Sequence, residues 1–171
     1  MNTAVPVAPA ASPVWFRALS WLAPLALIVT AWVPDDGADR PLPLAGSVFL
    51  TLLGVGLAAL LAQLPRQLSY TLTDTGLRIS RFSGTFEWPY RDLRLRRTEG
   101  HLGLKVGGVG LPGYYSGNYT FTGPAYRSVQ ALASNTQGGL IVERGGVPYY
   151  LTPADPDALA RDLAARGVPT A

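Results

Sequence analysis

The sequence predicts a two-helix transmembrane hairpin followed by a mainly-β domain. We expect about seven antiparallel strands, in a small barrel or orthogonal sandwich capped by a C-terminal α-helix. Three observations predict this: two long apolar runs near the start, alternating apolar residues from position 68 onward, and one well-punctuated helix near the end. The predicted organisation is a disordered tail over 1–13, the hairpin over 14–65, the β domain over 66–166 and a tail over 167–171.

The second apolar run, residues 42–64, contains no charged residue. A helix rises about 1.5 Å per residue, so a run of this length crosses a hydrocarbon core of roughly 30 Å. This run is therefore expected to be a transmembrane helix.

The first apolar run, residues 14–33, contains one charge, Arg17. Trp15 and Trp32 lie near its two ends, where indole rings favour the membrane interface. Pro24 lacks an amide N–H and is expected to kink this helix. The run is predicted to be the first membrane helix.

A cleaved signal peptide is the alternative for the first run, since a positive residue followed by an apolar core is typical of one. No small-x-small cleavage site follows Val33, and a short polar turn leads directly into the second run. In the second helix, Gly54 and Ala58 are spaced to allow close approach of the first. These features favour an uncleaved hairpin, although small residues are also common in membrane helices.

The distribution of charges predicts the orientation of the hairpin. One arginine lies near the start of the first helix and several follow the second, whereas the connecting loop is mainly acidic. Positive residues favour the cytoplasmic side, so the loop is expected outside and both termini in the cytoplasm. The residues concerned are Arg17, Arg66, Arg78 and Arg81 on the inner side, and Asp35, Asp36, Asp39 and Arg40 in the loop.

Alternation of apolar and polar residues predicts strands from position 68 onward. The glycine-rich stretch 99–118 interrupts this pattern and is interpreted as a loop. The N-terminal tail, MNTAVPVAPAASP, is rich in Ala and Pro and is expected not to fold.

The C-terminal helix has clear start and stop signals. Asp155 is expected to cap it and Pro156 to take the first helical position, while Gly167 ends it. Leu159 and Leu163 form its apolar stripe.

Four stretches resemble the bacterial pleckstrin-homology-like (PH) domain family: YTLTDTGLRIS, FEWPYRDL, GVGLPGYYSGNYTF and GLIVERGGVPYYLTPADPDALARDL. The resemblance covers roughly residues 67–166, and some members of the family follow membrane helices. It implies seven strands in two sheets with a C-terminal helix at one open end. With the predicted hairpin, the expected location is the inner membrane of a bacterial cell, as a multi-pass protein. The resemblance brings no catalytic or ligand-contact residues.

Two groups of residues are candidate interaction sites. Arg91, Arg94, Arg96 and Arg97 lie within seven residues, where anionic lipid headgroups or an acidic partner could meet them. Tyr114 and Tyr115 follow the glycines and either form a contact surface or complete the core. We therefore expect a non-enzymatic module that binds protein or anionic lipid. The protein partner could also be a second copy of the chain, in a homo-oligomer.

Composition and motifs argue against several other functions. From Arg66 onward, twelve basic and eight acidic residues give a net charge of +4, a weak electrostatic footprint for nucleic acid. The chain has no cysteine and one histidine, His101, so neither a metal site nor a cofactor is expected.

The glycines at 108, 110 and 113 match the spacing GxGxxG, but no helix is predicted after them, as a dinucleotide site requires. The alternative to an interaction module is a cryptic membrane enzyme, or a regulatory subunit of a membrane complex, with a small-molecule site in the Gly/Tyr-rich loop. For that alternative, His101 and the tyrosines are the candidates for proton chemistry.

Overall fold

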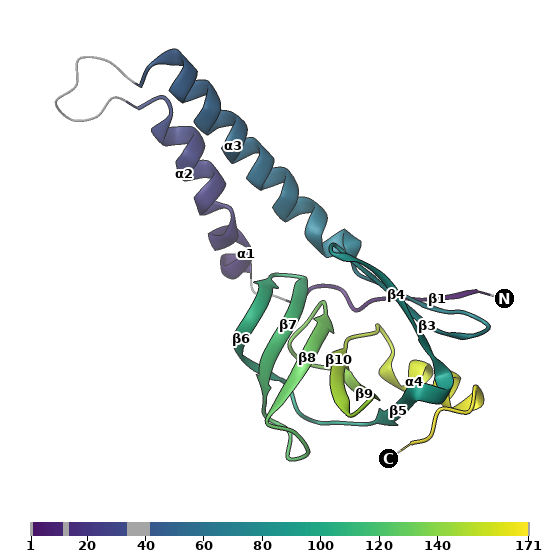
Figure 1. The fold of residues 1–171 in the computed structure, drawn as a ribbon. Helices are drawn as coiled ribbons and strands as arrows, with labels where there is room; N and C mark the ends of the chain where they lie inside the picture. The colour runs from purple at the N-terminus through teal and green to yellow at the C-terminus, as the bar shows by residue number, and fades with distance from the viewer. Residues whose placement is uncertain (1, 12–13, 34–41, 171) are drawn as a thin grey trace. The chain divides into compact units, whose positions relative to one another are not determined.

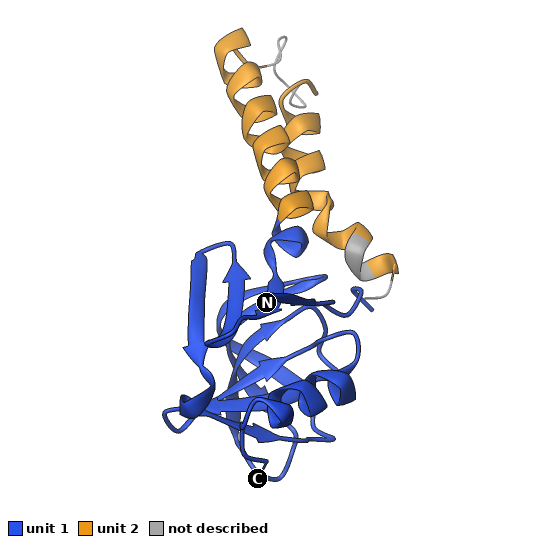
Figure 2. Cartoon of the chain, turned by 90° about the vertical axis from the view of Figure 1, so that its right-hand side faces the viewer, with its two compact units in different colours: residues 1–11, 64–171 blue, residues 12–63 orange. Residues whose placement is uncertain are grey.

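The computed structural model describes residues 2–11, 14–33 and 42–170, except the side chains of Phe16 and Arg17. The chain divides into two compact units (Figure 2). Residues 12–63 form the helical unit, and residues 1–11 and 64–171 form the β domain. The acidic loop of the predicted hairpin, Asp35 to Arg40, lies outside the described residues.

The helical unit contains α1 (Val14–Ser20), α2 (Leu22–Thr30) and α3 (Leu44–Gln63). A 3₁₀ turn, η1 (Leu64–Gln67), follows α3. Among the described helices, only the segment Leu44–Gln67 is long and apolar enough to cross a membrane. The second predicted span is therefore present as a candidate membrane helix.

The first predicted span is divided between two helices, so the predicted distortion near Pro24 is present, but a single membrane helix over 14–33 is not confirmed. The span is interrupted at Trp21, between α1 and α2. Pro24 has no N–H to donate one turn back, and its ring crowds that turn, so the break lies just before the proline. The apolar segment Ala18–Thr30, which includes this break, is too short to qualify as a span.

Helices α2 and α3 lie side by side (Figure 1). A Cβ added at Gly54 would lie 2.7 Å from the Ile28 Cγ1 and 2.9 Å from the Pro24 carbonyl oxygen. Trp32 Nε1 donates a 3.0 Å hydrogen bond to Thr51 Oγ1. The predicted close approach at Gly54 is thus present, because only glycine leaves room for it.

The β domain contains ten strands among the described residues, arranged in two sheets (Figure 1). The first sheet has the order β1-β2-β3-β4 and the second has the order β5-β9-β10-β8-β7-β6. The strands are β1 (Thr3–Val5), β2 (Ser69–Leu72), β3 (Gly76–Arg81), β4 (Gly84–Pro89), β5 (Leu93–Arg96), β6 (Leu102–Leu111), β7 (Tyr114–Phe121), β8 (Ser128–Ala133), β9 (Leu140–Arg144) and β10 (Val147–Leu151). A 3₁₀ turn, η2 (Tyr90–Asp92), joins the sheets, and α4 (Pro156–Ala165) follows β10.

This arrangement corrects three predictions about the sheet. The domain is not a closed barrel, because its strands form two separate sheets. β10 pairs with β8 in parallel, so the strands are not all antiparallel. The glycine-rich stretch is not a loop, since most of it forms the ten-residue strand β6 and the start of β7.

The N-terminal tail is a strand and not a disordered segment, which corrects a fourth prediction for its described residues. β1 pairs antiparallel with β2, with Val5 opposite Tyr70. Farther along, Ala8 N donates to the Thr152 carbonyl at 3.0 Å, and Asn135 Nδ2 donates to the Pro9 carbonyl at 2.7 Å. Prolines are tolerated here because β1 is an edge strand.

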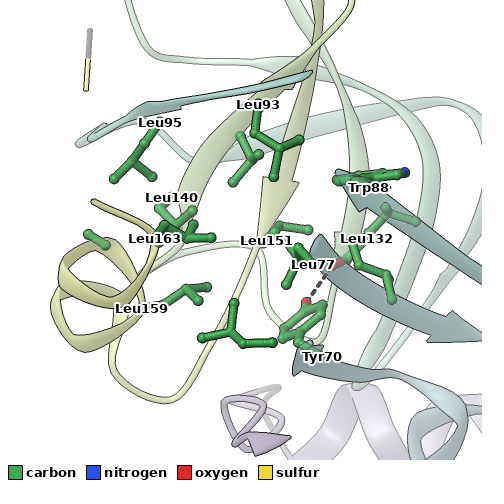
Figure 3. Close-up of a cluster of buried hydrophobic side chains, with 14 of the residues drawn as sticks. Tyr70, Leu77, Trp88, Leu93, Leu95, Leu132, Leu140, Leu151, Leu159 and Leu163 are labelled. Carbon is green, nitrogen blue, oxygen red and sulfur yellow. Dashed lines mark hydrogen bonds between the residues drawn. The ribbon is translucent and has the colours of Figure 1, made fainter. Parts of the chain in front are cut away.

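The main core lies between the two sheets and α4 (Figure 3). Tyr70 crosses it and donates a 2.5 Å hydrogen bond to the Leu132 carbonyl of the other sheet. Helix α4 begins and closes as predicted: Asp155 Oδ1 accepts from Ala158 N at 2.8 Å, and Gly167 has φ +85°. The largest buried members of the core are Tyr70, Leu72, Leu77, Ile79, Trp88, Leu93, Leu95, Leu151, Leu159 and Leu163.

The β domain has two ends, which are set by where the chain leaves it. The chain passes to the helical unit after Ala11 and re-enters at Leu64. Gly113, in the β6–β7 turn, lies between these points: a Cβ added there would be 3.1 Å from the Ala10 Cβ and 3.2 Å from the Pro65 Cβ. We call this the attachment end.

The opposite end of the second sheet follows from strand direction. Near the attachment end, Tyr115 of β7 pairs with Ala133, the last residue of β8. β10 is parallel to β8, so the first residue of β10, Val147, lies at the other end. There it pairs with Arg144 of β9. We call this the distal end.

Candidate interaction site

A shallow depression of about 540 Å³ lies at the distal end of the β domain. η2, β5 and the β9–β10 turn form its walls, and Pro169 of the C-terminal tail completes them. Its charged residues are Arg91, Asp92, Arg94 and Glu143. Both signs of charge are therefore present, as in a surface that recognises a partner by charge complementarity.

Arg91 and Arg94 are placed by the junction between η2 and β5. Arg91 lies in the 3₁₀ turn with its side chain 86% exposed, and its nearest carboxylate is Asp92 at 3.7 Å. Arg94 is exposed on the face of β5 opposite to Leu93 and Leu95, which point into the core. The predicted alternation on this strand is confirmed, and it directs Arg94 into the depression.

The β9–β10 turn brings a third arginine to the distal end, which sequence reasoning missed. Gly145 and Gly146 have φ of +57° and +80°, the double positive φ of a type I′ hairpin turn. Arg144 precedes them and lines an adjoining depression with Asp92 and Tyr149. Arg-Gly-Gly between two apolar runs was the available signal, because such a turn holds its flanking side chains at a sheet end.

The other two predicted arginines are occupied by neighbours within the domain. Arg96 lies 5.5 Å from the centre of the Tyr126 ring, in a cation–π contact, and its Nε is buried. Tyr126 in turn donates a hydrogen bond to Glu143. Arg97 forms a 3.1 Å ion pair with Asp157 of α4. The structure thus brings Arg91 and Arg94 together as the arginine face and separates Arg96 and Arg97 from it. Arg144 pairs with Leu93 across the sheet, and its guanidinium lies 5.8 Å from the centre of the Trp88 ring, so it lies beside this face and not within it.

The two predicted tyrosines are largely structural. Tyr114 is 3% exposed and belongs to the main core, and its hydroxyl accepts a 3.2 Å hydrogen bond from Phe82 N. Tyr115 is half-buried and packs edge-on against Tyr119 at 6.2 Å. Burial raises the pKa of Tyr119 to about 12. Of the two roles left open for the tyrosines, completing the fold is the one that the contacts favour.

The GxGxxG residues lie in β6 and in the β6–β7 turn, which no helix follows. Gly108 has φ +104°, and a Cβ there would lie 2.2 Å from the Ser116 carbonyl oxygen of β7. These glycines permit two strands to approach closely. The geometry that cradles a dinucleotide, a strand leading into a helix, is not formed by these residues.

The described residues contain no group of three or more His, Cys, Asp or Glu side chains arranged to hold a metal ion. His101 is exposed, and its Nδ1 lies 3.0 Å from Thr122 Oγ1. This pair has no carboxylate in its hydrogen bonds and resembles an ordinary contact between neighbouring strands.

A hydrogen-bonded cluster around the carboxylate of Glu87 stabilises the β2–β3 turn at the distal end of the first sheet. Glu87 accepts hydrogen bonds from Thr73 at 2.7 Å and Thr75 at 2.5 Å, and it pairs with Arg78 at 2.8 Å. Hydrogen bonds from Thr75 and Thr73, and then from Arg78, lower the pKa of Glu87 from 4.5 to about 2. Glu87 is therefore ionised at neutral pH and holds the residues of the turn together.

A family model described as bacterial PH domain matches residues 68–167 of the chain. No curated protein and no solved structure matches it. The match runs from just before β2 to the glycine that ends α4, and so includes the whole arginine face. It leaves β1 and the helical unit outside.

Proposed function

Because the chain belongs to the bacterial PH domain family, we propose that it is a non-enzymatic, membrane-anchored interaction module. A PH-like domain supports a role in interaction. In this proposal the helical unit is a hairpin that crosses the inner membrane, both termini are cytoplasmic, and the domain presents its arginine face to a protein partner with an acidic segment.

The exposed apolar surface of the helical unit carries the anchoring part of the proposal. Large apolar side chains of α2 and α3 point away from the unit; for example, Leu25 is 52%, Phe49 65% and Leu52 66% exposed. Contiguous exposure of this kind is unfavourable in water and favourable in lipid. The close packing at Gly54 supports a paired arrangement, in which both apolar segments enter the bilayer together.

The location of the arginine face favours a protein over lipid headgroups. Arg91, Arg94 and Arg144 lie at the distal end, whereas the chain reaches the helical unit from the attachment end. Lipid attraction falls off within about a Debye length, roughly 8 Å, of the bilayer surface. A soluble partner meets no such limit. Anionic lipid is the other outcome of the test below.

The experiment places a photo-crosslinking amino acid at Val147, beside the depression, in the full-length protein in cells. We expect protein adducts that are lost in the double variant Arg91→Glu, Arg94→Glu. The matched control is Arg161→Glu, an exposed arginine on α4. Adducts that survive the double reversal, or no adducts at all, would contradict the arginine-face proposal, and charge-dependent lipid adducts would identify lipid as the ligand.

Anchoring is tested separately by alkaline carbonate extraction of membranes. We expect the full-length protein to stay in the pellet and a chain without residues 12–63 to be released. Release of the full-length protein would exclude an integral anchor.

A further inference from the structure

The turn between β3 and β4 carries an exposed aromatic side chain at its tip. Phe82 is 59% exposed, and it is followed by Ser83 and by Gly84 with φ +129°. Turn residues are usually polar, so this phenylalanine departs from ordinary turn chemistry, and its meaning depends on where the turn lies and how it is held.

This turn lies at the attachment end. Ser69 at the start of β2 pairs with Ser80, so the β3–β4 turn projects at the end where β2 begins, five residues after the domain starts at Leu64. Phe82 N also donates to the hydroxyl of Tyr114, whose neighbour Gly113 lies beside Ala10 and Pro65. The turn and both chain connections therefore share one end of the domain.

The turn is held in place while its aromatic ring stays free. Arg81 Nη1 donates to Ser116 Oγ at 3.4 Å, and its guanidinium lies 4.9 Å from the centre of the Phe86 ring. Together with the Phe82 N–Tyr114 bond and the pairing of Arg81 with Gly84, this holds the backbone at the base of the tip. An exposed ring on a fixed backbone loses little conformational entropy on contact.

The segments around this turn carry positive charge. Residues 8–11, 64–69, 80–85 and 109–116, which lie at this end, contain Arg66 and Arg81 and no Asp or Glu. Asp155, which follows β10 beside Pro6, caps α4. The distal end, in contrast, contains Asp74, Glu87 and Asp92 besides its arginines. A mainly basic surface with an aromatic tip matches the interface of an anionic bilayer.

We propose that the β3–β4 turn is a membrane-contact loop, with Phe82 inserted at the headgroup boundary of the bilayer and Arg66 near anionic headgroups. The proposal rests on the anchoring proposed above and adds a second, peripheral contact to it. Two residues separate Ala11 from α1, and none separates α3 from Leu64, so the attachment end stays within reach of the bilayer surface. The contact would fix the orientation of the domain and direct the arginine face away from the membrane.

The experiment uses the absence of cysteine in the chain, which allows single-site labelling of the full-length protein. An environment-sensitive fluorophore is attached in the variants Phe82→Cys, Val147→Cys and Val55→Cys, each in nanodiscs of phosphatidylcholine and phosphatidylglycerol. Val147 is a matched control, because it is 39% exposed beside a hairpin turn at the distal end. Val55 is 52% exposed on α3 and reports anchoring. Lipids with nitroxide groups serve as the quencher.

We expect strong quenching at 55, clear quenching at 82 and none at 147, with the quenching at 82 reduced several-fold in pure phosphatidylcholine. Quenching at 55 without quenching at 82 would overturn the membrane-contact loop and leave the anchor intact. Equal quenching at 82 and 147 would overturn it as well, because the contact would then not be specific to the attachment end. Absence of quenching at 55 would overturn both the anchor and the loop.

Discussion

The β domain buries its large apolar side chains, whereas the helical unit exposes many of its own. In the β domain Trp88 and Leu151 are at most 2% exposed, whereas in the helical unit Phe49 and Leu52 are about two-thirds exposed. The difference teaches that exposure of apolar residues depends on the surrounding solvent as much as on the fold. The domain excludes water from its interior, whereas the helical unit exposes a surface that suits lipid, as the proposed anchor requires. Changes in the two regions should therefore have separate consequences.

The largest expected effect is in the domain core. Trp88→Ala removes a buried ring that packs against Tyr149 at 4.5 Å and Phe86 at 5.7 Å. We expect the free energy of unfolding of the β domain to fall by about 3–5 kcal/mol. Urea denaturation of nanodisc-bound protein, followed by pulse proteolysis of the domain, measures it. The matched change Phe49→Ala should leave that value unaltered, and an equal loss in both variants would remove the contrast.

The next effect concerns the N-terminal tail, which belongs to the domain although it precedes the helices. Deleting residues 2–9 removes β1 and also the four hydrogen bonds that join residues 6–9 to Ser134, Asn135, Thr152 and Ala154. At about 0.5–1 kcal/mol for each of these four hydrogen bonds, we expect a destabilisation of roughly 2–4 kcal/mol in the same assay. An unchanged unfolding midpoint would show that β1 contributes nothing to the domain.

A smaller effect is expected inside the helical unit. In Gly54→Val the new side chain overlaps Ile28 and the Pro24 carbonyl, which should weaken packing of α2 on α3 by about 1–3 kcal/mol. Cross-linking between cysteines introduced at Trp32 and Thr51 measures their proximity. Gly56→Val is the control, because a Cβ there meets nothing within 4 Å. Equal cross-linking in the two variants would argue against close approach at Gly54, and the domain should be stable in both.

The smallest effect is acid sensitivity, confined to the domain. The pKa of Glu87 is about 2 in the folded state and 4.5 ordinarily, so its contribution to stability is present above pH 4.5 and lost as the pH falls towards 2. Glu87→Gln should flatten the dependence of the unfolding midpoint on pH in that range. The same slope in both proteins would mean that other carboxylates cause the loss. The helical unit, whose described part contains no carboxylate, should keep its helicity throughout.

Local signals predicted the elements that depend on neighbouring residues. The cap at Asp155, the stop at Gly167 and the alternation around Leu93 and Leu95 were readable because each acts over a few residues. The same holds for the apolar run that became α3. The predicted membrane role and the absence of enzymatic activity remain proposals.

Pairing between segments distant in sequence determined the features that the sequence pattern did not predict. Whether residues 3–5 form a strand depends on a free edge at β2, and the glycine-rich segment becomes β6 because β7 accepts it. Of the four adjacent arginines, two contact Tyr126 and Asp157, which are distant in sequence, while Arg144 of β9 packs over Trp88. The sequence by itself determined which segments are helical, apolar or basic, since propensity and periodicity are local. Only the tertiary structure decided which side chains remain free and at which end of the domain they lie, because strand order and register depend on contacts between distant residues.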